Sequence, residues 1–186
     1  ELASANIDAS GANAGGNVRI GGDYQGQGSL AQAENVSMDE ASVINVSATD
    51  NGDAGSAVLW SNGITDFQGK ILATGGVNGG NGGVVETSGA YLNAYGDVDA
   101  SAAKGKAGKW LLDPLNIVIS NLANFLTNVS ASGSTLTVTP AGALANVRAS
   151  SIEAALNGGT DVTVTTQGTT GGGQGDITVL SAINWS

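Results

Sequence analysis

The sequence predicts an all-β fold in which short strands recur and stack on one another as a solenoid. The first observation behind this prediction is composition: the 186 residues include 30 Gly but only 2 Pro, and charged residues make up 12%, about half of the usual share. Small β-branched residues joined by Gly and Asn are typical of strands and tight turns. The second observation is an internal repeat.

Each unit of the repeat is a short apolar strand followed, several residues later, by glycine and a second strand. The five units comprise residues 7–10 with 15–20, 44–47 with 55–60, 71–74 with 82–87, 98–101 with 108–113, and 162–165 with 175–179. The first four begin at residues 7, 44, 71 and 98, so the intervals are 37, 27 and 27. A period in the twenties predicts a solenoid. The longer first interval predicts an insertion within residues 23–43.

The second strands of the units predict which side chains face the interior. Aligned with one another, they place one aliphatic column inward: Val18, Val58, Val85, Leu111 and Ile177. Side chains alternate along a strand, so the preceding column is expected to face outward: Asn17, Ala57, Val84, Trp110 and Asp176. The inward column is uniformly aliphatic, as the interior of a solenoid requires.

The tail, residues 115–186, departs from the 27-residue period. Residues 116–120 and 135–139 alternate like strands, and one helix is expected over residues 151–157. Ser151 is its predicted N-cap, and Gly158 with Gly159 predicts its end. Its apolar face would comprise Ile152, Ala155 and Leu156. We expect this helix to plug or flank the solenoid. Residues 1–186 are thus interpreted as a single segment of a longer protein, with regular coils over residues 1–114.

Charge and residue usage exclude several classes of function. The net charge of −10 argues against binding to nucleic acid or to an anionic membrane surface. The chain has no His and no Cys, which removes the commonest general base and the thiol ligands of metals. No apolar stretch approaches the roughly 18 residues that a membrane-spanning helix needs. We therefore expect no catalytic residues, no metal and no cofactor.

An enzyme is the less favoured alternative, because polysaccharide-degrading enzymes also use parallel β-helices. Such enzymes need several carboxylates gathered on one face. Glu86, Asp97 and Asp99 fall in neighbouring units at outward positions, where they could approach one another and hold a cation. Solubility of the surface explains the three acids more simply.

Outward-facing aromatic residues provide the one hypothesis for a ligand. If Leu92 and Ala94 face inward, then Tyr91, Asn93 and Tyr95 face outward on one strand, and the alignment places Trp110 outward in the next unit. Aromatic rings along one flank can stack on sugar rings, with Asn supplying hydrogen bonds. The alternative, which we favour, is that these rings cover loop edges or fill gaps between coils.

Five segments of the chain resemble the filamentous haemagglutinin-like adhesins, which are exported by two-partner secretion. These segments are GGNGGVVETSG at residues 79–89, GKWLLDP at 108–114, SIEAALNGGTDV at 151–162, GDITV at 175–179 and INWS at 183–186. The resemblance extends over residues 1–186 and is weakest at residues 23–43. It implies a right-handed parallel β-helix, export through an outer-membrane partner, and a role in attachment or biofilm formation. It implies no catalytic residue.

The function expected from the sequence is therefore structural or adhesive. The chain would be part of a large adhesin, secreted or held at the bacterial cell surface, and its secretion partner would recognise a domain outside this chain. Matrix polysaccharide or a host-cell surface is the expected target. Binding of exopolysaccharide at Tyr91, Asn93, Tyr95 and Trp110 is the alternative.

Overall fold

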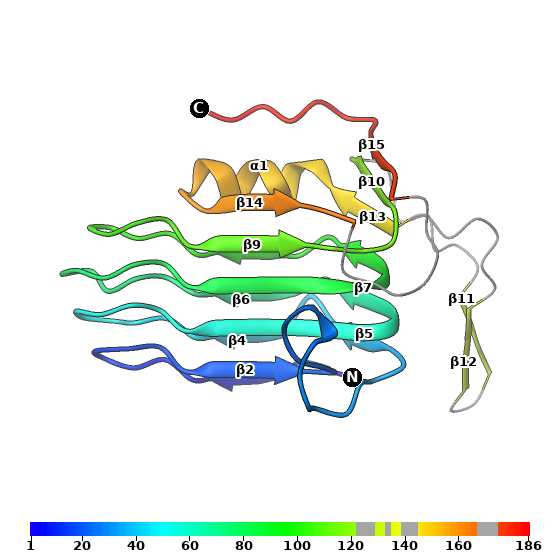
Figure 1. Ribbon diagram of the computed structural model, residues 1–186, viewed down its shortest axis with the longest axis horizontal. Helices are drawn as coiled ribbons and strands as arrows, with labels where there is room; N and C mark the ends of the chain where they lie inside the picture. The colour runs from blue at the N-terminus through cyan, green and yellow to red at the C-terminus, as the bar shows by residue number, and fades with distance from the viewer. Residues whose placement is uncertain (122–128, 133–134, 139–144, 167–174) are drawn as a thin grey trace.

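The computed structural model describes residues 1–121, 129–132, 135–138, 145–166 and 175–186, and for residues 129–138 only the backbone is considered. The described chain is mostly β, with parallel sheets and one short α-helix, which confirms the all-β prediction. Figure 1 shows the strands stacked level upon level, with β2 near one end and β14 beside α1 at the other. Among the described helices, none has the length and apolar character to cross a membrane.

A small sheet of four parallel strands forms one side of the molecule. Its strands, in spatial order, are β1 (Asn6–Asp8), β4 (Val43–Asn45), β6 (Lys70–Leu72) and β8 (Asp97–Asp99). The pairing places Ile7 beside Ile44, Ile44 beside Ile71, and Ile71 beside Val98. This register confirms the intervals of 37, 27 and 27 residues.

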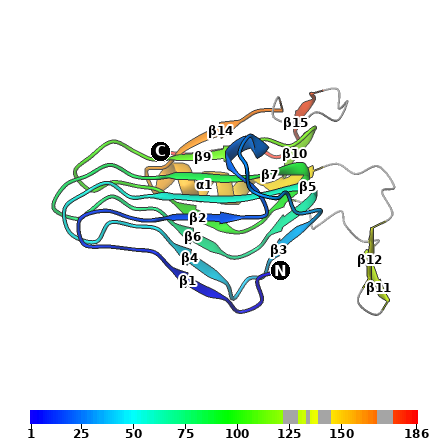
Figure 2. The ribbon, with the colours of Figure 1, turned by 60° about the horizontal axis from the view of Figure 1, so that its bottom comes forward.

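A larger sheet forms the rest of the body, and its two longest strands bend so that the sheet has two arms (Figure 2). These strands are β5 (Ser56–Phe67) and β7 (Val84–Ala94), whose register shifts between Ser61 and Ile64. Beside them, the first arm contains β2 (Asn17–Ile20), β9 (Lys109–Leu112) and β14 (Asp161–Val164). The second arm contains β3 (Val36–Met38), β13 (Ala145–Arg148), β10 (Ile117–Ser120) and β15 (Ile177–Val179).

Close backbone contacts at glycine set the register of the first arm. The amide of Lys109 donates a hydrogen bond to the carbonyl of Gly83 (2.9 Å), and Val84 does the same to Gly55 (3.1 Å). A Cβ atom added to Gly83 would lie 2.1 Å from the Gly55 oxygen, and one added to Gly108 would lie 2.2 Å from the Gly83 oxygen. The equivalent positions are therefore Gly16, Gly55, Gly83 and Gly108.

This register corrects the predicted columns. The inward column of the first arm is Val18, Ala57, Val85, Trp110 and Val162. Ala57 and Trp110 are fully buried, so their predicted outward orientation is wrong. Val58 and Leu111 face the opposite side of the sheet. The cause is that the sequence alignment matched the first glycine of each Gly-Gly pair to the single glycine of the other units.

The fifth predicted unit is also wrong. Its first strand, β14, pairs with β9 of the large sheet rather than with the small sheet. Its second strand, β15, pairs with β10, where Ile177 lies beside Ile117. Ile177 remains 48% exposed because β15 is an edge strand of the second arm. It is therefore not a member of the predicted inward column.

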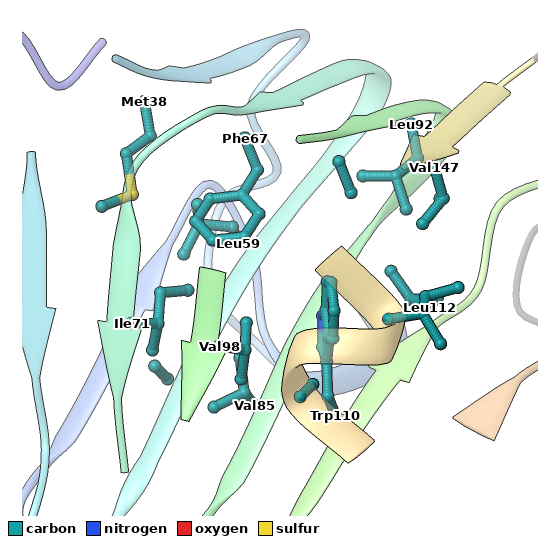
Figure 3. Packing of buried hydrophobic residues seen from close by; sticks show 14 of the residues in the cluster. Met38, Leu59, Phe67, Ile71, Val85, Leu92, Val98, Trp110, Leu112 and Val147 are labelled. Atoms are coloured by element: carbon teal, nitrogen blue, oxygen red, sulfur yellow. The ribbon is translucent and has the colours of Figure 1, made fainter. Parts of the chain in front are cut away.

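The core fills the space between the sheets, and Trp110 lies within it beside α1 (Figure 3). The Trp110 ring meets the edge of Phe67 at a centroid distance of 6.4 Å and an interplanar angle of 79°. Its indole Nε1 donates a 3.0 Å hydrogen bond to Thr87 Oγ1. The largest buried ring of the core is thus fixed by packing and by its one polar atom.

The insertion predicted within residues 23–43 lies between β2 and β3. In the later units, β5 and β7 each continue from the first arm into the second as one strand. In the first unit, β2 and β3 are instead separated by a loop, residues 21–35, that contains the 3-10 helix η1 (Tyr24–Gly26). β3 and the first residue of β4 belong to the regular pairing. Figure 2 shows the dark blue loop over the outer side of the large sheet.

The tail contains the predicted helix. α1 spans Ala149–Asn157, so it begins two residues before Ser151, the predicted N-cap. Arg148 is the N-cap residue instead. Gly158 ends it, and Gly159 has a φ of +86°, as the predicted glycine stop requires. Ile152 and Ala155 are buried in the core. α1 packs against β8, at the edge of the small sheet where a fifth strand would otherwise pair.

Two strands were predicted in the tail, and both are present. Residues 116–120 contain β10, and β12 (Thr135–Val138) falls within residues 135–139; Thr139 lies outside the described residues. β12 pairs antiparallel with β11 (Val129–Ser132). β10 does not pair with β7, because β13, which comes later in the chain, lies between them.

Trp110→Ala tests the corrected orientation. Removing a fully buried indole is expected to lower the free energy of unfolding by about 3–5 kcal/mol. Its neighbour Lys109 is exposed, so Lys109→Ala should change stability by less than about 0.5 kcal/mol. Urea unfolding followed by circular dichroism measures both. A small loss in the tryptophan variant would contradict the inward orientation.

Candidate functional site

The four residues predicted to bind carbohydrate do not share one exposed surface. Leu92 and Ala94 are fully buried and face inward, as predicted. Asn93 and Tyr95 lie on the opposite side of β7, but they are only 3% and 6% exposed. Trp110 is inside the core, and Tyr91 alone is partly exposed. A covered ring offers no face to a sugar, so carbohydrate binding stays a prediction without its aromatic platform.

The outer side of the second arm carries a stack of polar side chains instead. The register places Asp66 beside Asn93, and Asn93 beside Asn146. Asn146 Nδ2 donates a hydrogen bond to the Tyr95 hydroxyl, and Ser120 Oγ donates one to Asn146 Oδ1 at 2.9 Å. β13 therefore sets polar residues of its own beside those of β7, and among the described residues Asn93 Nδ2 is left without a hydrogen-bond partner.

Tyr95 is held from two sides in this stack. The Arg148 guanidinium lies 4.7 Å from the centre of its ring, within the range of a cation–π contact. Burial raises the pKa of the Tyr95 hydroxyl, the Asn146 hydrogen bond and the Arg148 charge lower it, and the Asp66 carboxylate raises it. These contacts support the interpretation, favoured from the sequence, that the ring fills a gap between strands.

Asp66 lies at the other end of the stack. Burial raises the pKa of its carboxyl group, while the neighbouring Gln68 and Asn93 side chains lower it. The Gln68 side-chain amide donates to Asp66 Oδ1 at 2.5 Å. The polar stack is thus organised mainly by contacts among its own members.

A second polar cluster lies on the outer side of the first arm, under the loop of residues 21–35. It contains Glu86 and Ser88 of β7 and Asp113, which follows β9; their side chains are 0%, 1% and 1% exposed. The backbone amide of Gln25 donates a 2.8 Å hydrogen bond to Glu86 Oε2. Gln25 has a φ of +54°, a conformation that is uncommon for residues other than glycine. The loop therefore turns sharply onto the carboxylate.

The loop also packs closely on a ring. Trp60 of β5 is only 5% exposed. A Cβ atom added to Gly26 would lie 2.5 Å from the Trp60 ring, and one added to Gly22 would lie 2.8 Å from it. The two glycines let the backbone approach this ring, and the approach closes the loop over Glu86.

The electrostatics of this cluster are unusual for the outer side of a sheet. Burial raises the pKa of Glu86; the Gln25 amide and the Ser88 hydroxyl lower it, and the charge of Asp113 raises it. Burial and then the charges of Glu86 and Asp113 raise the pKa of Tyr24. Within the described residues, the one ion pair joins Arg19 to Asp23, and Glu86 has no basic partner.

The acid group considered from the sequence is not assembled. Glu86 lies in the large sheet, whereas Asp97 and Asp99 lie on β8 of the small sheet. Asp99 Oδ1 accepts a 3.0 Å hydrogen bond from the amide of Ser101. Asp8 makes the same contact with Ser10 at 2.9 Å. These acids of the small sheet close turns.

Sequence reasoning missed the cluster of Glu86, Ser88 and Asp113. Its signal was present: once Gly83 is aligned with Gly108, Ser88 of VETSG falls beside Asp113 of WLLDP. The burial had no signal, because a loop 61 residues from Glu86 supplies it. No model of a known protein family matches this chain, and no curated protein sequence is similar to it.

Glu86, which is buried, and Asp66, which is half-buried, predict an unusual pH dependence. Both carboxyl groups have a raised pKa in the folded chain, so the folded state binds their protons more tightly than the unfolded chain does. This stabilisation is complete below the ordinary values of 3.8 and 4.5. It is lost as pH rises through the raised values. In metal-free buffer, the urea midpoint should therefore fall as pH rises above these ordinary values.

Single variants identify the groups responsible. Glu86→Gln and Asp66→Asn should each flatten the pH profile, whereas Asp97→Asn, at an exposed position, should not. Asp8 and Asp39 have a lowered pKa because hydroxyl and amide groups donate to them. The stability that these two groups contribute is therefore lost only as pH falls below 3.8. A urea midpoint that rises with pH above the ordinary values of the Glu86 and Asp66 carboxyl groups would contradict the prediction.

Proposed function

We propose that the chain is a segment of a right-handed parallel β-helix. One coil would comprise a strand of the small sheet and then the two arms of the large sheet. The parallel, in-register pairing of β1, β4, β6 and β8 supports this proposal, as does the inward column of the first arm. The right hand follows from the general preference of parallel crossover connections.

We propose that this segment is a structural, adhesive part of a large bacterial surface adhesin of the filamentous haemagglutinin-like type. It would be secreted or held at the cell surface, after export through an outer-membrane partner that binds a domain outside this chain. The observation that carries the proposal is the in-register stack of strands, whose outward polar groups bond to one another, as Asn146 does to Tyr95. A stack of strands of this kind suits the shaft of an adhesin, the part that holds a binding surface away from the cell.

Two of the motifs that resemble this family lie beside each other in the stack. VETSG is in β7 and WLLDP begins in β9, and these strands are neighbours. Each coil would lengthen the shaft by about 4.8 Å, the spacing between strands. A net charge of −10 would help to keep an extended surface soluble. Matrix polysaccharide or a host-cell surface would be the target of the whole adhesin.

Removal of one complete coil tests the β-helix. Residues 70–96 span one 27-residue interval, and both Lys70 and Asp97 follow glycine, so the deletion preserves a Gly–Asp junction. β4 would then pair with β8, and β5 with β9. Because solenoid stability is a sum over neighbouring units, we expect a cooperative melt at a lower Tm and a retained β-sheet circular dichroism spectrum.

A deletion of half a coil is the matched control. Removal of residues 70–83 would bring β7 into the level of β6 and should abolish the cooperative melt. If both deletions melt alike, the stacked-coil proposal is wrong.

Attachment of bacteria that carry the full-length protein tests the adhesin role. Deletion of the whole gene should abolish attachment, whereas cells lacking only residues 70–96 should attach at the wild-type level if the segment is a shaft. Val85→Asp buries an unpaired charge and should lower surface display, measured by antibody staining. Normal attachment without the gene would overturn the adhesin proposal. Loss of attachment with normal display in the coil deletion would instead assign a binding surface to this coil.

A further inference from the structure

The cluster beneath the loop of residues 21–35 contains two buried oxygen atoms, one on Glu86 and one on Ser88, without a hydrogen-bond partner among the described residues. We propose that Glu86, Ser88 and Asp113 bind a calcium ion there, and that the ion ties the loop to β7 and β9. This proposal does not depend on the adhesin function. It concerns a face of the chain other than the polar stack around Tyr95.

The strand geometry directs these side chains to one place. Glu86 and Ser88 are two residues apart on β7, so they point to the same side of the sheet. Thr87 pairs with Leu112, and the next position of this register sets Ser88 beside Asp113. Asp113 is close enough to Glu86 for its charge to raise the pKa of the Glu86 carboxyl group.

Two of the oxygen atoms lack a hydrogen-bond partner among the described residues. Glu86 Oε2 accepts the Gln25 amide, but Glu86 Oε1 and Ser88 Oγ are both buried and accept or donate no hydrogen bond. The Ser88 hydroxyl lies near the carboxylate and lowers its pKa, yet the two groups do not reach hydrogen-bond geometry. Buried polar atoms left in this way indicate an absent partner, such as an ion or water.

Charge favours an ion over water. A buried carboxylate without a basic partner requires either a proton or a cation, and Glu86 has no ion pair in the described chain. Acidic pH supplies the proton. At neutral and alkaline pH, a cation would neutralise the same group, so the ion and the proton would compete for Glu86.

The donor atoms select the kind of cation. They are carboxylate and hydroxyl oxygens, which suit hard cations, and the site contains no His or Cys. Mg²⁺ usually keeps several waters, whereas Ca²⁺ accepts irregular sets of protein oxygens. No group of three or more acidic residues gathers in the described parts of the chain. The remaining ligands would therefore be backbone carbonyls of the loop or water.

Thermal unfolding at pH 8 tests the proposal. Relative to chelator, calcium at a hundredfold excess over its Kd should raise Tm by about 5–10 °C. Glu86→Gln, which can still accept the Gln25 amide, and Asp113→Asn should lose this rise. Asp97→Asn, at an exposed position on β8, should retain it. An unchanged wild-type Tm, or an equal rise in Glu86→Gln, would overturn the site. An equal rise with sodium at matched ionic strength would show screening and overturn it too.

Terbium luminescence provides a readout that does not depend on stability. Trp60 pairs with Ser88 across β5 and β7, and Tyr24 feels the charges of Glu86 and Asp113, so both rings are near enough to excite a bound Tb³⁺. The wild type should show saturable emission at one ion per chain, displaced by calcium. Ser88→Ala, the mildest change, should weaken binding while circular dichroism shows a folded chain. Absence of saturable emission from the folded wild type would overturn the proposal, even if the carboxylate variants failed to fold.

Discussion

Close packing of backbone against backbone at Gly16, Gly55, Gly83 and Gly108 determines much of the remaining structure. Each glycine lets the next strand approach, and a Cβ atom at Gly108 would lie only 2.2 Å from the Gly83 oxygen. Because side chains alternate along strands, this one contact decides which residues face the core. A shift of one residue would expel Trp110 from the interior and bring Leu111 in. The burial of Trp110 therefore follows from the position of the glycine that precedes each strand.

The sequence predicted the small sheet correctly and the large sheet less well, for a physical reason. In the small sheet the aliphatic residues recur at a constant interval, so Ile44, Ile71 and Val98 align without ambiguity. In the large sheet a Gly-Gly pair allows two alignments, and only the backbone contact distinguishes them. The position of β13 between β7 and β10 had no local signal, because residues distant in sequence form that pairing.

The same non-local pairing explains why Asn93 and Tyr95, predicted as part of an exposed binding surface, are buried. Alternation on β7 correctly placed Asn93 and Tyr95 on the outer side, but it carried no information about what lies against them. β13 brings Asn146 and Arg148 onto these residues, and exposed groups become an internal polar network. On β7, the side of the sheet to which each side chain points is a local property and could be predicted. Burial was a property of the tertiary structure and could not.

The loop of residues 21–35 creates a conflict that the rest of the sheet avoids. Outward carboxylates on a sheet normally remain in water, but this loop closes over Glu86 through Gln25 and packs on Trp60. Loop closure and neutralisation of the carboxylate are therefore thermodynamically linked. Any species that neutralises Glu86 must stabilise the closed loop, and closure must in turn raise the affinity for that species. The insertion thus makes the local stability of the first coils responsive to protons and cations.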